Sequence, residues 1–271
     1  MELLNATKMQ AGYTMGMKPD GSEMLVVAVK GTFLIPQDEK NAQLAEKQVP
    51  LVEADVATGA PGFSAPLYES DYAARKPECD VLLNGSAYAP RGRATESVSV
   101  TMRVGILSKS FEVVGDRVWQ RGRATAPRPF TVMPISYNNA FGGTDACHPD
   151  AKYHRTYLPN HAGIGFHEKN STNYIDGTPL PNTQELGRPV TQPHGNYRPM
   201  AYGTLGRAWE QRVKLAGTYD QQWLDNKAPF LPDDFDELYY QAAPADQRIQ
   251  HPKGGEVVEL INLTPEGYVK F

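Results

Sequence analysis

The feature that most constrains the fold is a strict alternation of polar and apolar residues over 97–104. The segment reads Ser-Val-Ser-Val-Thr-Met-Arg-Val. Successive side chains of a strand point to opposite faces of a sheet. We therefore expect Val98, Val100, Met102 and Val104 to face a core and the polar residues between them to face water. This pattern predicts an antiparallel sheet with one buried face.

Further strand signals lie on both sides of this segment. Residues 9–36 predict a hairpin around the turn Lys-Pro-Asp-Gly at 18–21, because these residues favour a tight reversal. The run 24–35 is almost continuously apolar, which is typical of a strand covered on both faces. Residues 255–271 predict a second hairpin. Together with the β-rich residues 1–135, they predict a mainly β protein, an antiparallel β-sandwich.

Residues 134–200 have no sustained helical or strand period, yet they are not a typical linker. Flexible linkers contain few large side chains. This stretch contains seven aromatic residues: Tyr137, Phe141, Tyr153, Tyr157, Phe166, Tyr174 and Tyr197. Aromatic side chains bury large areas and need defined neighbours, and a loop this long is usually functional or disordered. We therefore expect a long, ordered, irregular excursion from the β scaffold that serves as a binding surface.

Residues 204–243 predict a few short helices that cover the sheets. The candidate helices are 205–215 after Thr204, 218–226 with a capping box at Thr218, and 233–240 capped by Asp233 or Asp234. Pro229 and Pro232 interrupt this region, which excludes a long helix. With the β-rich, irregular and returning β parts, these helices predict a single domain over 1–271.

Composition and charge narrow the class of protein. The chain has 271 residues, of which 40% are hydrophobic and 21% charged, as in soluble globular proteins. The net charge of −4 gives no electrostatic footprint for nucleic acid. There is no apolar run of about 18 residues, so we expect no membrane span. Without a signal peptide, and with only Cys79 and Cys147, the predicted location is cytoplasmic.

Candidate metal ligands are concentrated in the irregular stretch. Five of the six histidines lie there, at His148, His154, His161, His167 and His194, near Asp145, Cys147, Asp150, Glu168 and Glu185. A zinc site needs three or four converging ligands, and these spacings match neither His-Glu-x-x-His nor Cys-x-x-Cys. Signatures of a catalytic nucleophile or of phosphate binding are also missing. We therefore predict no stoichiometric zinc, no cofactor, no catalytic residues and no enzymatic activity.

Three classes of function remain open at this point. An interaction protein would present a wide protein-binding surface. A carbohydrate-binding module would stack aromatic side chains against a sugar in a groove. A metal-dependent hydrolase would bring ionisable groups of the histidine-rich loop together in a cleft.

Six motifs resemble a known bacterial family over essentially the whole chain. They are residues 9–13 (MQAGY), 77–85 (PECDVLLNG), 105–110 (GILSKS), 134–143 (PISYNNAFGG), 179–183 (PLPNT) and 230–235 (FLPDDF). The family is a domain of unknown function encoded beside VgrG spike and PAAR-type genes in type VI secretion clusters. The resemblance implies a cytoplasmic, non-enzymatic adaptor, or chaperone, that helps load a toxic effector onto the VgrG spike. It implies no catalytic triad and no metal ligands.

The adaptor interpretation places the partner site in the irregular stretch. Transient interfaces have polar rims and a few aromatic anchors, so we predict contacts to the effector, the PAAR-type protein or VgrG by Asn138, Asn139, Phe141, Tyr153, Tyr157 and Phe166. At least one of Tyr153, Tyr157 and Phe166 should lie at the surface beside the turn formed by residues 138–143. The alternative is that this turn is structural and the aromatic residues form a core.

Overall fold

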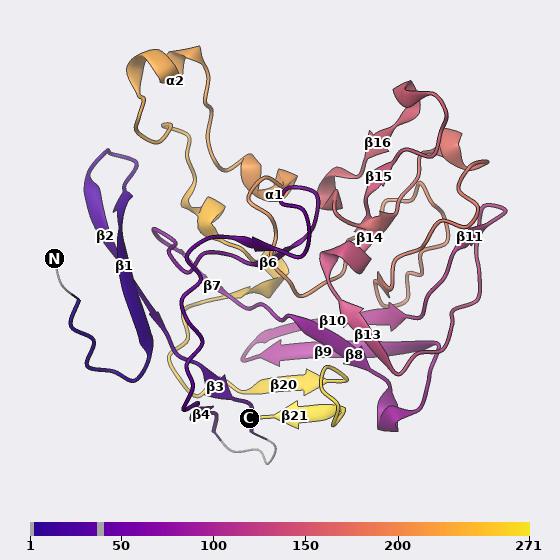
Figure 1. The fold of residues 1–271 in the computed structure, drawn as a ribbon, viewed down its shortest axis with the longest axis horizontal. Coiled ribbons are helices and arrows are strands. Elements are labelled where there is room, and N and C mark those ends of the chain that lie inside the picture. Colours follow the sequence, from indigo (N-terminus) through magenta and orange to yellow (C-terminus); the bar gives the residue numbers. More distant parts are fainter. Residues whose placement is uncertain (1–2, 37–40) are drawn as a thin grey trace.

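The computed structural model describes residues 3–36 and 41–271 and shows a mainly β protein (Figure 1). Its largest sheet has five strands in the order β18-β10-β9-β20-β21. These strands are β9 (Ser97–Val104), β10 (Leu107–Val114), β18 (Thr183–Gln184), β20 (Val258–Ile261) and β21 (Tyr268–Lys270), all antiparallel to their neighbours. The prediction of a mainly β, antiparallel fold is confirmed, and the C-terminal hairpin joins the central sheet.

The remaining strands form two-stranded ribbons around this sheet. The antiparallel ribbons are β1 (Gln10–Met17) with β2 (Glu23–Lys30), β3 (Phe33–Leu34) with β4 (Gln43–Leu44), β5 (Val56–Ala57) with β6 (Pro66–Tyr68), β7 (Cys79–Asp80) with β19 (Arg248–Ile249), β8 (Gly85–Tyr88) with β13 (Val132–Ile135), β11 (Trp119–Gln120) with β12 (Arg123–Ala124), and β15 (Thr144–Asp145) with β16 (Arg155–Thr156). The pair β14 (Phe141–Gly142) with β17 (Ile164–Gly165) is parallel.

The alternation in β9 sets the core face of the large sheet, as predicted. Val98, Val100 and Met102 are buried, and Val104 at the end of the strand is half-buried. Arg103 points to the exposed side, where its Nη1 lies 2.8 Å from Oε2 of Glu259 on β20. The buried side chains join the main hydrophobic core, to which β10 and β20 also contribute.

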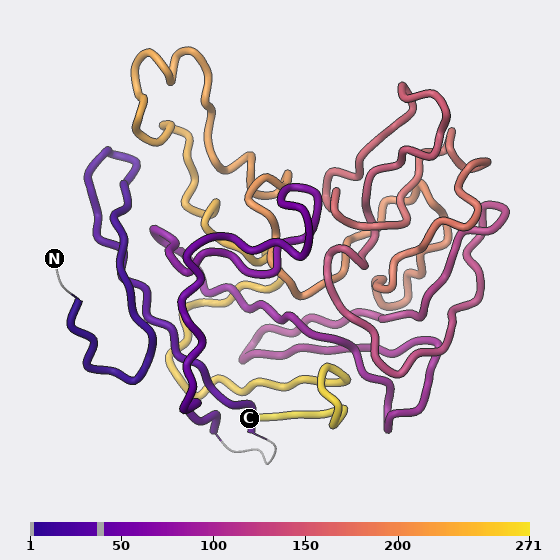
Figure 2. The backbone as a smooth tube through the Cα atoms, viewed as in Figure 1, coloured from indigo at the N-terminus to yellow at the C-terminus, as the bar shows by residue number. Residues whose placement is uncertain are grey.

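Residues 134–200 form an ordered lobe beside the sheet (Figure 2). Their regular elements are β14 to β18 and four single-turn 3₁₀ helices: η2 (Tyr137–Asn139), η3 (Ala151–Tyr153), η4 (Leu158–Asn160) and η5 (Lys169–Ser171). The lobe has its own core of Trp119, Phe141, Ile175, Leu180, Val190 and Tyr197. Gly142 has a φ of 152°, and a Cβ there would collide with the carbonyl oxygen of Asn160. Only glycine allows this close approach of two backbone segments.

The helices are shorter than the sequence predicts. The helix expected over 205–215 is reduced to α1 (Glu210–Val213). The Leu205 carbonyl accepts from the buried Arg212 side chain at 2.8 Å, and the Trp209 amide, its partner in a helix, donates to Gly206 O instead. α2 (Gln221–Asn226) ends where predicted, but its cap is Asp220, whose carboxylate accepts from Trp223 N at 2.8 Å. The remaining single turns are η1 (Pro90–Gly92), η6 (Glu237–Tyr240), which Asp236 caps, and η7 (Ala245–Gln247).

No helix in the described ranges is both long enough and apolar enough to cross a membrane.

The core face of β9 gives a direct test of this architecture. Met102 is 2% exposed and Ile106, in the turn that follows, is 95% exposed. Met102→Ala should lower the free energy of unfolding by about 2–5 kcal/mol because it leaves a cavity in the core. Ile106→Ala should change it by less than about 0.5 kcal/mol. Denaturant unfolding of the two variants measures both values, and equal losses would contradict the assigned faces of β9.

Candidate functional site

The aromatic residues expected to bind a partner pack against one another. Phe141 is fully buried, and its ring meets those of Tyr157, Phe166 and Tyr197 edge-on, with centroids 5.1, 6.2 and 5.0 Å away. Tyr157 and Phe166 are half-buried. The Tyr157 hydroxyl lies 2.9 Å from Asn196 Oδ1 and 2.8 Å from Tyr197 O. These contacts make the aromatic group a core of the lobe, with Phe141 at its centre.

The two asparagines of the 138–143 turn also have structural partners. Asn138 accepts a hydrogen bond from Ala65 N and donates one to Thr58 Oγ1, both at 2.8 Å, and so attaches the turn to a distant loop. Asn139 donates from Nδ2 to Pro134 O at 3.1 Å. Side chains engaged in this way fix the backbone of the turn, which supports the structural alternative for the turn.

Tyr153 is the last residue of η3 and is half-buried. Its ring meets the His148 ring edge-on at a centroid distance of 4.4 Å, and the Lys152 ammonium lies 4.9 Å from the ring centroid. Partner contacts by Tyr153, Tyr157 and Phe166 stay a prediction, whereas Phe141 is a core residue in this conformation.

A much more exposed apolar surface lies on the β1–β2 hairpin. Its cross-strand pairs Tyr13–Val27 and Met15–Leu25 lie on one side of the ribbon, and Val29 follows them on the same side. Met15 is 58%, Leu25 45%, Val27 49% and Val29 59% exposed. We call the surface formed by Met15, Leu25, Val27 and Val29 the outer face. The prediction that the 24–35 strand is covered on both faces is therefore wrong.

The opposite face of the hairpin is fixed to the body of the protein. Val26 and Ala28 are buried there. Gly12 sits so close to Tyr72 that a Cβ would collide with the Tyr72 hydroxyl, and Leu51 is also adjacent. Lys30 at the end of β2 forms an ion pair with Asp71 at 2.9 Å. These contacts hold the inner side of the ribbon against the body of the protein, so the outer face points toward solvent.

The hairpin also has two open edges. Its sheet consists of β1 and β2 alone within the described part of the chain. Backbone groups on the outer edges of such a ribbon are available to pair with another strand. A partner strand can pair with an open edge of the hairpin, and its side chains can then cover the apolar face.

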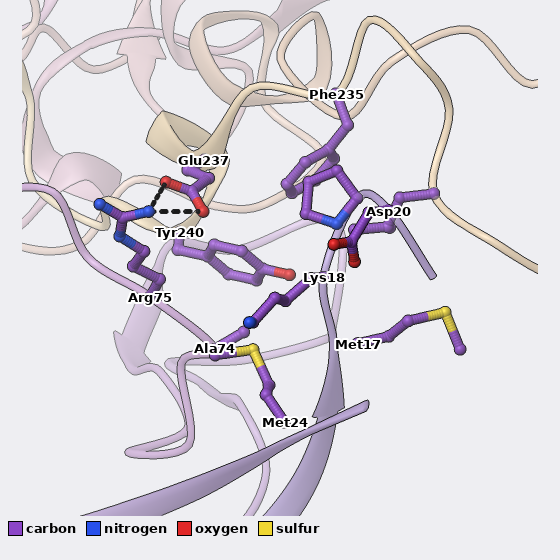
Figure 3. Close-up of a pocket in the computed structure, with 11 residues that line it drawn as sticks. Met17, Lys18, Asp20, Met24, Ala74, Arg75, Phe235, Glu237 and Tyr240 are labelled. Atoms are coloured by element: carbon purple, nitrogen blue, oxygen red, sulfur yellow. Dashed lines mark hydrogen bonds and ion pairs between the residues drawn. The ribbon is translucent and has the colours of Figure 1, made fainter. Parts of the chain in front are cut away.

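A pocket of about 290 Å³ lies at the tip of this hairpin (Figure 3). Met17 and Met24 of the hairpin line it together with Phe235 and Tyr240, and the turn supplies Lys18 and Asp20. Arg75 and Glu237 form an ion pair of 3.1 Å at its wall. Methionine adapts to irregular apolar surfaces, so the pocket suits an apolar side chain of a protein or peptide.

Of the candidate metal ligands, the structure brings Asp145, Cys147 and His167 together, with ligand atoms all within 4.8 Å of one another. Asp145 and His167 are buried, and Cys147 is half-buried. Asp145 accepts hydrogen bonds from Cys147 N at 3.0 Å and Glu168 N at 2.9 Å. Burial alone would raise the pKa of the Asp145 carboxyl, but the neighbouring Ser171 hydroxyl, the Cys147 and Glu168 amides and His167 hold it below its usual value.

The other histidines of the loop have different surroundings. His154 Nε2 lies 2.8 Å from His148 O, and the His161 ring packs on Trp209 at 5.1 Å.

Residues 20–271 match the family described as "Uncharacterized protein conserved in bacteria (DUF2169)". The chain belongs to the DUF2169 family. This confirms a bacterial family of unknown function, and the link to type VI secretion stays a prediction. No curated protein and no solved structure matches this DUF2169 protein.

The apolar sequence of β2 is the signal for the outer face. A strand that is apolar at nearly every position predicts two covered faces, but it does not say whether the same chain covers both. The described part of this DUF2169 protein buries Val26 and Ala28 on one face and leaves Leu25, Val27 and Val29 45–59% exposed on the other.

The packing of the lobe gives a second test. Phe141→Ala should lower the free energy of unfolding by about 3–5 kcal/mol, because the ring is fully buried among other aromatic side chains. Leu158→Ala is the control, since Leu158 is 60% exposed in the same lobe. Thermal and denaturant unfolding measure both variants. A Phe141→Ala variant with unchanged stability would show that the lobe does not pack as described.

Proposed function

We propose that this DUF2169 protein is a type VI secretion adaptor. In this role it binds a toxic effector, or the PAAR-type region of one, and helps to load it onto the VgrG spike in the cytoplasm. The observation that best supports a protein-binding role is the uncovered outer face of the β1–β2 hairpin. The resemblance of the six sequence motifs supports the assignment to type VI secretion.

The outer face has the properties of a docking surface. Contiguous exposed apolar patches on soluble proteins usually mark interaction sites. Met15, Leu25, Val27 and Val29 are adjacent in two paired strands and each is 45–59% exposed. Covering each of them would gain a part of the ~1.5–3 kcal/mol that full burial of such a side chain contributes. Several such contributions are enough for specific but reversible binding, which a loader needs.

The open edges of the hairpin suggest how a partner would attach. An extended segment of the effector or of a PAAR-type protein can add a strand to an open edge, and its side chains can then cover the apolar face. Main-chain hydrogen bonds supply affinity that is independent of sequence, whereas the pocket lined by Met17, Met24 and Phe235 would select a side chain. No catalytic group takes part in this role, so the adaptor is proposed as a non-enzymatic protein.

The proposal is tested with a charge placed on the outer face. The tagged protein first identifies its partner by co-purification from its own bacterium and mass spectrometry, and the affinity of the purified pair is then measured. Val27→Asp should weaken binding by about 10–100-fold, the effect of losing an interface anchor of about 1–3 kcal/mol. Its melting temperature should stay nearly unchanged because Val27 is 49% exposed.

Ile106→Asp is the matched control, because it places the same charge on an exposed aliphatic residue in the turn between β9 and β10. It should leave binding unchanged. Unchanged affinity in Val27→Asp, together with weakened binding in folded variants of Tyr153 or Phe166, would move the partner site to the lobe. Co-purification that yields no effector, PAAR-type protein or VgrG would contradict the adaptor role.

A further inference from the structure

His167 and Asp145 form a buried contact in the irregular lobe. Nδ1 of His167 lies 3.1 Å from Oδ1 of Asp145, and Nε2 lies 3.1 Å from Oγ1 of Thr178. The Thr178 hydroxyl also lies 2.6 Å from Ile175 O and can donate its single hydrogen there. Its oxygen is then an acceptor for an Nε2–H of His167, and in that tautomer Nδ1 presents a lone pair to Asp145.

Nδ1 in this tautomer and Oδ1 of Asp145 are both suitable metal ligands. The Asp145 carboxylate accepts from two backbone amides, which hold its oxygens in place. A metal ion bound by both atoms would account for two lone pairs that face each other at 3.1 Å.

We propose that Asp145, Cys147 and His167 form a structural metal site for Zn²⁺ in the irregular lobe. One nitrogen, one oxygen and one sulfur atom within 4.8 Å are a ligand set that zinc accepts. Two ligand atoms of a tetrahedral zinc ion lie about 3.3 Å apart, close to the 3.1 Å that separates Nδ1 and Oδ1 here. This inference does not depend on the adaptor role.

The surroundings of the three residues match those of metal ligands. A histidine that binds a metal usually donates its other ring N–H to a fixed acceptor, which Thr178 provides here. Ser171 supplies a second, independent observation. Its hydroxyl is fully buried and lies against Asp145, yet makes no hydrogen bond of good geometry with any described atom. It is therefore available as a fourth ligand, directly or through a water molecule.

Cys147 completes the ligand set through its thiol. It forms no disulfide in the part of the chain that is described. On binding, Zn²⁺ takes the place of the thiol proton, which is released to solvent. The ion would then join β15, which contains Asp145, to His167 and to η5, which contains Ser171.

The experiment loads the full chain with zinc, or with Co²⁺ as a spectroscopic probe, and removes the excess by dialysis. Elemental analysis should find about one zinc per chain, and zinc should raise the melting temperature. The cobalt form should show a thiolate-to-metal charge-transfer band, which needs no variant to detect. A cobalt spectrum without this band, or zinc removed completely by dialysis, would overturn the proposal and leave a plain hydrogen bond between His167 and Asp145.

Cys147→Ser and Cys79→Ser are a matched pair, because both cysteines are half-buried and free. Cys147→Ser should lose the cobalt band and most of the zinc, whereas Cys79→Ser should keep both. His154→Gln should also keep zinc, since His154 lies outside the cluster and contacts His148 O. Retention of the charge-transfer band in Cys147→Ser, or its loss in Cys79→Ser, would contradict the assigned ligands.

Discussion

Hydrogen bonds from buried side chains to backbone groups hold the irregular parts of this protein in place. Arg212 is 1% exposed and donates to Leu205 O at 2.8 Å, to Tyr239 O at 2.7 Å and to the Glu69 carboxylate at 2.7 Å. The fully buried Gln247 donates to Val81 O and Tyr202 O, both at 2.9 Å. Buried backbone groups need partners, and here side chains replace the missing ladders. These side chains therefore join segments that are far apart in sequence.

The β1–β2 hairpin and the irregular lobe lie at opposite ends of the molecule. The β1–β2 hairpin stands at one side of the long axis, and the lobe of β14 to β17 stands at the other (Figures 1 and 2). The aromatic side chains of the lobe cover one another, because Phe141 is buried among them, and Asn138 joins the lobe to Ala65 and Thr58. The outer face of the hairpin, in contrast, is 45–59% exposed. We therefore propose that the hairpin binds the partner and that the lobe, with its proposed zinc ion, is structural.

Local patterns in the sequence predicted local structure well. The alternation at 97–104 and the Lys-Pro-Asp-Gly turn at 18–21 each depend on neighbouring residues only, and both predictions are confirmed. The helix expected after Thr204 begins only at Glu210, because the Arg212 side chain donates to the Leu205 carbonyl. His167 meets Asp145 through an irregular chain path, so no fixed spacing could predict the contact. Likewise, a strand such as β2, with apolar residues on both faces, indicates that both faces are buried. It does not indicate whether the same chain or a partner protein buries the second face.

Hydrogen–deuterium exchange on the protein alone and bound to its co-purified partner tests the central claim most directly. Amides of paired strands exchange slowly only while their hydrogen bonds stay closed. The account predicts that partner binding slows exchange in peptides covering Gln10–Met17 and Glu23–Lys30, with little change over residues 134–200. Slower exchange confined to residues 134–200, with the hairpin unaffected, would contradict it and place the docking surface in the lobe.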